Sequence, residues 1–265
     1  MIKKIQRFIR RVKELEGLYS KVARLEYKVD RFHSNSESSL SFHPQLNDKY
    51  CVSFENGLGK WTSHFQYFQK DKYIRFLLPT CEFIDSNHRN KLGVIQFLLW
   101  LWTCPKEIQE NTSFLGNGDP DLRGAKVSVE IRGRDFKPNG AELFWWSQAQ
   151  RNIEIGDNKD WRRSCWIYKD FPLTRYLLDG EWHNVKFTLV NDETKWLEAG
   201  SSSCITDAEN YEFWELDNVL GHQNWNGGFI LAFVEARNLP AGLIDVRNFE
   251  LEYHNRQKAV KEVKG

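Results

Sequence analysis

Residues 121–150 read DLRGAKVSVEIRGRDFKPNGAELFWWSQAQ and carry the clearest fold signal in the chain. They contain two runs in which apolar and polar residues alternate, and the turn-forming segment KPNG separates them. Alternation with a period of two is the pattern of a half-buried β-strand, while Gly, Pro and Asn favour turns. The stretch therefore predicts two β-strands, over residues 125–133 and 141–149.

The second of these strands carries two adjacent tryptophans, Trp145 and Trp146. Neighbouring side chains on a strand point to opposite faces, so both rings cannot belong to one core. One ring is expected inside, and the other beside Glu142, Gln148 and Gln150. An aromatic ring among amides and carboxylates suits a sugar, whose C–H faces stack on the ring while its hydroxyls form hydrogen bonds. The alternative is that both rings are buried, one against each of two layers.

Ten segments in all have the pattern of short strands, and Gly, Asn, Asp or Pro occupy the turns between them. No long helical period separates them, which predicts a mainly β fold: an antiparallel two-sheet β-sandwich over residues 49–254. Residues 211–220 are expected to form a short helix or an ordered loop, and residues 255–265 a charged tail. The ten segments are 50–54, 64–69, 73–79, 93–102, 125–133, 141–149, 164–170, 183–190, 229–236 and 243–253.

Residues 1–32 have a different character, because they contain ten Lys or Arg and four Asp or Glu. Apolar residues recur there at alternating three- and four-residue steps, close to four heptads, except at Glu26. We predict an amphipathic basic helix that forms a short coiled coil and assembles the chain into a dimer or trimer. The Ser-rich residues 33–48 would be the linker to the sandwich. The alternatives are a helix lying on an anionic membrane surface and a helix packed on its own β domain.

The composition of the chain bears on which classes of partner it could bind and on the cellular compartment in which it is expected. The net charge of +1 gives no case for a nucleic-acid partner. The five cysteines are odd in number and lack CxxC spacing, which predicts free thiols in a reducing compartment. No signal peptide is recognisable, and the most apolar window, 94–102, is too short to span a bilayer. These features favour a cytoplasmic location, with membrane-peripheral contact through the basic helix as the alternative.

Four segments together resemble a known kind of domain. They are FENGLGKWTS, DLRGAKVSVEIRG, DGEWHNVKFTLV and GLIDVRNFELEY. Over residues 50–253 the chain resembles jelly-roll domains of the concanavalin/laminin-G and carbohydrate-binding-module type. The resemblance implies a jelly roll that binds sugar through aromatic residues on a concave sheet or in end loops.

The same resemblance implies a cofactor, because many such jelly rolls hold a structural calcium ion with an early Glu and a late Asp. The matching positions are Glu55 and Asp245. The loop NGDPD could also ligate calcium through Asp119 and Asp121, although it has equally the composition of a turn.

The candidate sugar site is assembled from three strands. If these strands are neighbours, their polar and aromatic side chains line one concave surface, with Glu142 on the same strand face as Trp146. If a second layer covers that face, Trp146 and Trp166 are core residues instead. Trp61 and Trp182 are expected to anchor strand starts. The surface would consist of Glu130, Arg132, Trp146, Gln148, Trp166 and Tyr168.

Catalytic motifs are weak. There is no ExDxxE, HExxH, GxSxG or Gly-rich phosphate loop. Asp245 is expected to share its strand face with Leu243 and Phe249, while Glu250 and Glu252 point the other way.

We therefore predict non-catalytic glycan binding by a sandwich displayed on an oligomerising helix. The alternatives are a glycoside hydrolase or lyase using Glu130 and Glu142, and a structural or assembly protein whose sandwich contacts other proteins.

Overall fold

The computed structural model describes residues 45–59, 61–63, 65–78, 89–90, 93–102, 120–155, 158–198, 214–221, 226–233 and 239–256. The predicted helix over residues 1–32 lies outside these ranges, as do most of the linker and most of the charged tail. In the described ranges, no helix is long and apolar enough to cross a membrane.

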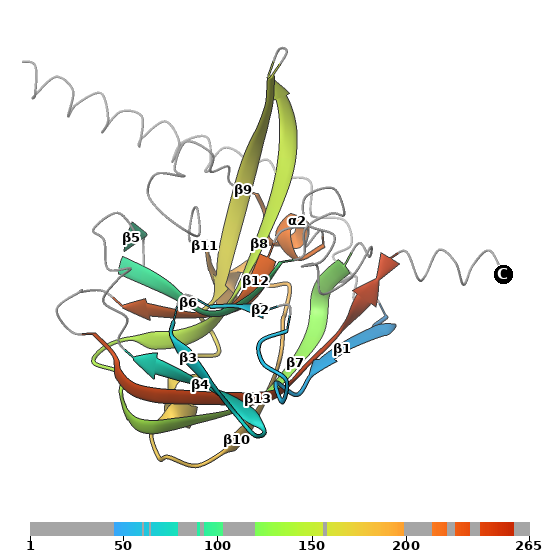
Figure 1. Cartoon of the computed structure of the whole chain (residues 1–265). Helices are drawn as coiled ribbons and strands as arrows, with labels where there is room; N and C mark the ends of the chain where they lie inside the picture. Colours follow the sequence, from blue (N-terminus) through green and yellow to red (C-terminus); the bar gives the residue numbers. More distant parts are fainter. Residues whose placement is uncertain are drawn as a thin grey trace, which may run out of the picture. The chain divides into compact units, whose positions relative to one another are not determined.

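The described strands form two antiparallel sheets (Figure 1). In the six-stranded sheet, β13 lies between β7 on one edge and β4 and β1 on the other. Its order is β10 (His183–Thr188), β7 (Pro120–Lys137), β13 (Ala241–Asn255), β4 (Tyr73–Leu78) and β3 (Tyr67–Lys70), with β1 (Asp48–Val52) paired to β13.

The seven-stranded sheet has the hairpin of β8 and β9 as its longest part (Figure 1). Its order is β11 (Trp196–Glu198), β9 (Asn158–Tyr168), β8 (Glu142–Ile155), β12 (Asn226–Phe233), β6 (Gly93–Trp102) and β2 (Trp61–Thr62), with β5 (Arg89–Asn90) paired to β6. Short helices connect strands: η2 (Thr174–Leu177), η3 (Glu193–Lys195) and α2 (Leu216–Gly221).

The predicted mainly β, two-sheet antiparallel fold is confirmed. The helix or loop expected over 211–220 is present in part, as α2. The two strands of residues 121–150 do not pair with each other. The chain turns at residues 138–141 and crosses between sheets, so that β7 lies in the six-stranded sheet and β8 in the seven-stranded sheet.

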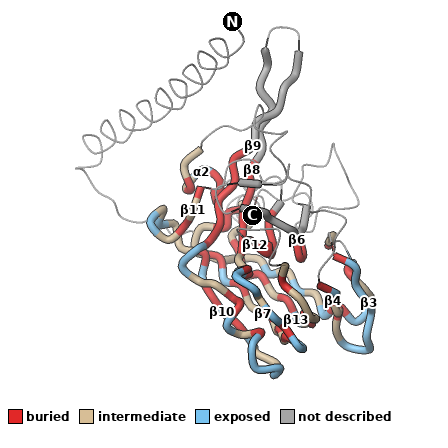
Figure 2. Tube along the Cα trace, turned by 90° about the vertical axis from the view of Figure 1, so that its left-hand side faces the viewer, coloured by how far each residue is buried: buried red, intermediate tan, exposed pale blue. Residues whose placement is uncertain are grey.

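In strand β7, the alternation of apolar and polar residues in the sequence corresponds to alternation between the buried and the outer face of the sheet. Its buried side chains alternate with partly or fully exposed ones, which Figure 2 shows as changes of colour along the strand. The apolar set packs in the core between the sheets, where burial stabilises the fold by roughly 25 cal/mol per Å² of apolar surface. The buried set is Ala125, Val127, Val129 and Ile131, and the outward set is Lys126, Ser128, Glu130 and Arg132.

Aromatic rings from both sheets fill the centre of this core. Trp145 on β8 stacks on Phe249 of β13, with ring centroids 6.3 Å apart. Phe229 of β12 packs edge-on against both rings, and Trp61 of β2 packs edge-on against Phe249 at 4.7 Å. Trp145 and Trp61 are thus core residues, and the structural role expected of Trp61 is confirmed.

A β-bulge in β13 changes which residues face outward. Asn248 has a left-handed backbone (φ 50°), and the register with β7 shifts between Arg247 and Glu250. The extra residue places Arg247, Asn248 and Glu250 outward while Phe249 stays in the core. The expectation that Glu250 and Glu252 point away from the Asp245 side was therefore wrong, because simple alternation fails at a bulge.

Candidate ligand-binding site

Trp146 lies on the outer face of the seven-stranded sheet but is only 1% exposed. It packs in a small apolar cluster with Cys165, Ile167 and Ile230. Gln148, on the same strand face, is fully buried. The alternative in which both adjacent tryptophans are buried is thus confirmed, and the open surface expected around Trp146 is not formed.

Trp166 and Tyr168 point to the opposite side from Trp146. In the β8–β9 pair Trp146 lies opposite Ile167, whereas Trp145 lies opposite Tyr168. Trp166 and Tyr168 therefore join the central core, at 3% and 5% exposure. The prediction that they share a surface with Trp146 was wrong, because the pairing register between two strands decides which residues meet.

Glu130 and Arg132 lie on neither of these surfaces, since β7 belongs to the other sheet. They face outward from the six-stranded sheet, whereas the exposed Glu142 faces outward from the seven-stranded sheet. Packed sheets lie about 10 Å apart, and the two carboxylates point away from each other across both sheets. The structure therefore does not bring Glu130 and Glu142 together as a hydrolytic pair.

The outer face of the six-stranded sheet has a continuous row of side chains across four strands. Arg132 of β7 lies opposite Asp245 of β13, Asp245 opposite Arg75 of β4, and Arg75 opposite Phe68 of β3. Phe68 is exposed at 48%. We name the region around this row the Arg–aromatic face. It comprises Phe68, Tyr73, Arg75, Glu130, Arg132, Arg134, Trp182, Asp245, Arg247 and Asn248.

Asp245 organises this face, although its side chain is fully buried. Arg75 donates from Nε to Oδ1 at 2.7 Å, and Arg132 donates from Nη2 to Oδ2 at 2.6 Å. Arg134 approaches Oδ2 at 3.4 Å. The bond to Asp245 raises the pKa of Arg75 above its ordinary value. Three guanidinium groups thus compensate one buried carboxylate.

Glu130 forms a second ion-pair centre beside the first. Arg247 donates from Nε to Oε2 at 2.7 Å, and the bulge residue Asn248 donates from Nδ2 to Oε1 at 2.8 Å. Partial burial disfavours the charged form of Glu130, but the bonds from Asn248 and Arg247 outweigh that effect and lower its pKa. A glycosidase acid needs a raised pKa, so this environment does not suit Glu130 for that role.

Two half-buried aromatic rings lie among these charges. Tyr73 and Trp182 contact edge to face, with centroids 5.5 Å apart. Arg247 and Arg132 lie over the Trp182 ring at 4.1 and 4.5 Å. Trp182 directly precedes β10, as expected for a residue at a strand start. Its ring also belongs to the polar outer face.

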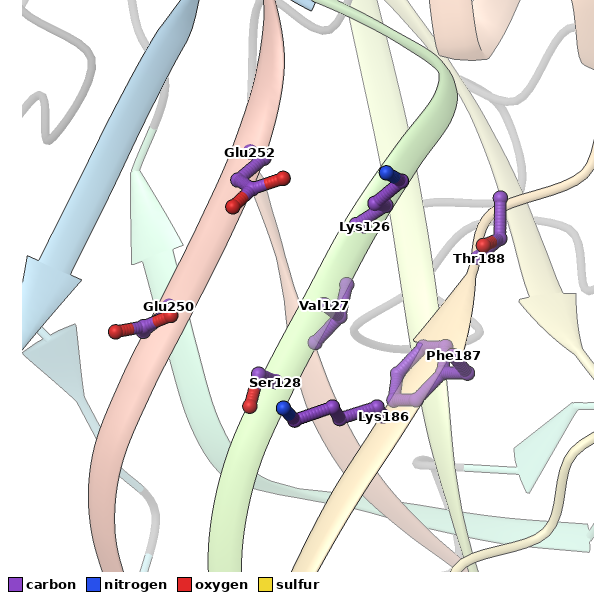
Figure 3. A pocket seen from close by; sticks show the side chains of 8 residues that line it. All are labelled: Lys126, Val127, Ser128, Lys186, Phe187, Thr188, Glu250 and Glu252. Carbon is purple, nitrogen blue, oxygen red and sulfur yellow. The ribbon is translucent and has the colours of Figure 1, made fainter.

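A groove adjoins the Arg–aromatic face on the same side of the sheet (Figure 3). It has a volume of about 390 Å³ and opens between β10, β7 and β13. Lys49 of β1 pairs with Glu250 at 2.8 Å and with Glu252 at 3.7 Å. The residues that line the groove are Lys126, Val127, Ser128, Lys186, Phe187, Thr188, Glu250 and Glu252.

Where the structure describes them, the residues expected to bind calcium are surrounded by groups other than further calcium ligands. Asp245 is bonded to arginines, while Glu55 is exposed in the turn after β1. Asp121 is a buried residue of β7 that pairs with Arg123 at 2.6 Å, and Asp119 lies outside the described residues. Within the described part of the chain, no group of three or more His, Cys, Asp or Glu could hold a metal ion. Calcium binding by Glu55 and Asp245 stays a prediction that calcium titration can test.

Sequence reasoning missed Tyr73, Arg75, Arg247 and Asn248 as members of one site. A signal was present in YIRFLL, where Tyr73 and Arg75 alternate with the buried Ile74 and Phe76. That pattern shows that the two side chains face outward. It does not show that β4 lies beside β13.

No protein-family model matches the chain, and no curated protein matches it. Among solved structures, the chain is similar to one described as "Solution structure, dynamics and binding studies of CtCBM11". The two share 10% sequence identity with a TM-score of 0.33, over 83% of this chain and 92% of that chain. Similarity at this level carries no argument about fold or ligand, so the two-sheet architecture rests on the strand pairing described above.

Proposed function

We propose that this protein binds glycans without catalysis, and that the Arg–aromatic face is the binding surface. The observation that carries the proposal is the pair of half-buried rings, Tyr73 and Trp182, on an outward sheet face among guanidinium and carboxylate groups. The resemblance of the sequence motifs to carbohydrate-binding jelly rolls supports the same class of function.

The chemistry of this face matches both parts of a sugar. The C–H side of a pyranose ring packs on an aromatic ring, while its hydroxyls both donate and accept hydrogen bonds. Guanidinium N–H groups are donors only, and an ionised carboxylate such as Glu130 is an acceptor only. Glu130 and Arg132 keep the ligand-binding role predicted from the sequence, now beside Tyr73 and Trp182.

The test is glycan-array screening of the full chain, followed by calorimetric titration of any glycan that binds. Trp182→Ala and Tyr73→Ala should each weaken binding by about tenfold, which corresponds to about 1.4 kcal/mol. Tyr67→Ala is the matched control, because Tyr67 is an exposed aromatic residue on β3 opposite the core residue Phe76. Folding of each variant is checked by thermal unfolding. Undiminished glycan binding by both site variants would refute the assignment of the surface.

A further inference from the structure

The Arg–aromatic face carries more positive than negative charge. Four arginines, Arg75, Arg132, Arg134 and Arg247, surround two carboxylates, Asp245 and Glu130. A neutral sugar needs donors and acceptors in similar measure, whereas this face offers an excess of cationic donors. The excess indicates a ligand that brings its own negative charge.

Two of these arginines have donor groups to spare. Arg247 uses Nε to bind Glu130, and its two Nη groups have no hydrogen-bond partner among the described residues. Arg134 contacts Asp245 from Nε at 3.4 Å, has no other ion pair within the described part of the chain, and is 46% exposed. A guanidinium with free Nη groups binds a carboxylate or sulfate through paired hydrogen bonds. The guanidinium of Arg247 lies over the Trp182 ring, 4.1 Å from its centroid, so an anion bound by its Nη groups would lie next to that ring.

The adjoining groove adds two lysines, Lys126 and Lys186, and two glutamates, Glu250 and Glu252, along the sheet. From Glu130 towards the groove, the next outward residues of β7 are Ser128 and then Lys126. Each step of two residues along the strand is about 7 Å. Lys49 neutralises part of the charge of Glu250 and Glu252. Lys126 and Lys186, by contrast, form no ion pair with any residue in the described ranges. Figure 3 shows both lysines at the groove, on β7 and β10.

We propose that the ligand is an acidic glycan, with carboxylate or sulfate groups on consecutive sugars. This proposal rests on the glycan-binding function proposed above and specifies its substrate class. A sugar contacts the exposed edges of Trp182 and Tyr73, and Arg247 and Arg134 each bind an anionic group of the glycan. The chain of sugars continues along β7 into the groove, where Lys126 and Lys186 bind the next anionic groups.

The test compares matched ligands by calorimetry with the full-length protein. Oligogalacturonate is compared with its fully methyl-esterified form, and dextran sulfate with dextran, so that the two pairs separate carboxylate from sulfate recognition. Polyglutamate serves as a polyanion without sugar. We expect at least one acidic glycan to bind tenfold or more tightly than its neutral partner, with affinity that falls as salt is added.

Variants locate the binding groups. Arg247→Gln and Arg134→Gln should each weaken binding of the acidic glycan about tenfold more than they weaken binding of its neutral partner. Arg134→Gln is the safer variant for folding, because its side chain is the more exposed. Arg175→Gln is the control, since Arg175 also lies over aromatic rings, those of Phe171 and Tyr176, but belongs to η2. Combined Lys126→Gln and Lys186→Gln should weaken long acidic oligosaccharides and spare short ones.

The outcomes separate the two proposals. Equal binding of acidic and neutral partners, with Trp182→Ala still disruptive, would overturn the acidic-glycan inference and leave glycan binding in place. Binding of polyglutamate as tight as that of the acidic glycan would also overturn it, because charge alone would then explain the affinity. Failure of every glycan to bind the folded protein would overturn both.

Discussion

At the scale of single residues, Asp245 shows how the candidate site and the stability of the sheet depend on the same group. Its carboxylate is fully buried, and three arginines from β4 and β7 converge on it. An uncompensated buried charge is costly, whereas a well-bonded one holds its partners in a defined geometry. The position of Arg132 beside Trp182 therefore depends on Asp245.

The first prediction concerns this carboxylate. Asp245→Asn should lower the free energy of unfolding by about 3 kcal/mol, because it leaves three guanidinium groups near a neutral amide. Urea unfolding measures the change. Asp179→Asn is the control: Asp179 is exposed and pairs with His183 at 2.9 Å, so its removal should leave stability unchanged within error. Equal effects of the two substitutions would contradict the role assigned to Asp245.

The second prediction concerns the pH dependence contributed by Glu130. Burial alone would raise its pKa, but bonds from Asn248 and Arg247 lower it below the ordinary value of 4.5. A lowered folded-state pKa contributes stability that is present above the unfolded pKa and lost as pH falls through the folded one. Wild type should therefore lose more stability than Glu130→Gln below pH 4.5. Parallel stability curves for the two proteins across this range would contradict the ion pair.

At the scale of elements, the close approach of η2 to β7 rests on one glycine. A Cβ atom at Gly133 would overlap the carbonyl oxygen of Leu177, which is backbone and cannot rotate away. The absence of a side chain there lets η2 pack against the strand that carries Glu130 and Arg132.

The third prediction follows from this contact. Gly133→Ala should destabilise the protein by about 2 kcal/mol or more, because overpacking forces backbone shifts. Chemical denaturation provides the measurement. Gly140→Asn is the control, since Gly140 has a left-handed backbone (φ 84°) in open space, which asparagine tolerates. A Gly133→Ala protein as stable as wild type would show that η2 can move off β7 at little cost.

At the scale of the whole molecule, weak sugar contacts gain affinity when several copies of a binding surface act together. The heptad pattern of residues 1–32 predicts such an assembly, and it stays a prediction because these residues lie outside the described ranges. An oligomer would present several Arg–aromatic faces to one polysaccharide.

The fourth prediction is that the full chain is a dimer or trimer and that deletion of residues 1–32 leaves a folded, less oligomeric protein. The apolar stripe buries best against copies of itself, and Glu26 weakens its last heptad. Light scattering of both proteins decides the matter. A monomeric full chain would contradict the coiled coil, and liposome co-sedimentation would then test the membrane-surface alternative.

The local features of the β domain could be predicted from the amino-acid sequence. Period-two alternation predicted the strands, and adjacency alone placed Trp145 and Trp146 on opposite faces of one strand. It also predicted that Glu130 and Arg132 point outward from β7. These inferences succeeded because the direction of a side chain on a regular strand depends only on the backbone of its immediate neighbours.

The contacts between distant residues could not be predicted from the sequence and became apparent in the folded domain. In the folded domain β7 and β8 belong to different sheets, and Trp146 is buried. The register between β8 and β9 directs Trp166 and Tyr168 into the core. A bulge at Asn248 reversed the expected direction of Glu250. The bond that anchors the candidate site joins Arg75 to Asp245, 170 positions apart. Such contacts depend on strand pairing across the whole domain, and short-range alternation carries no information about which distant strand becomes the neighbour.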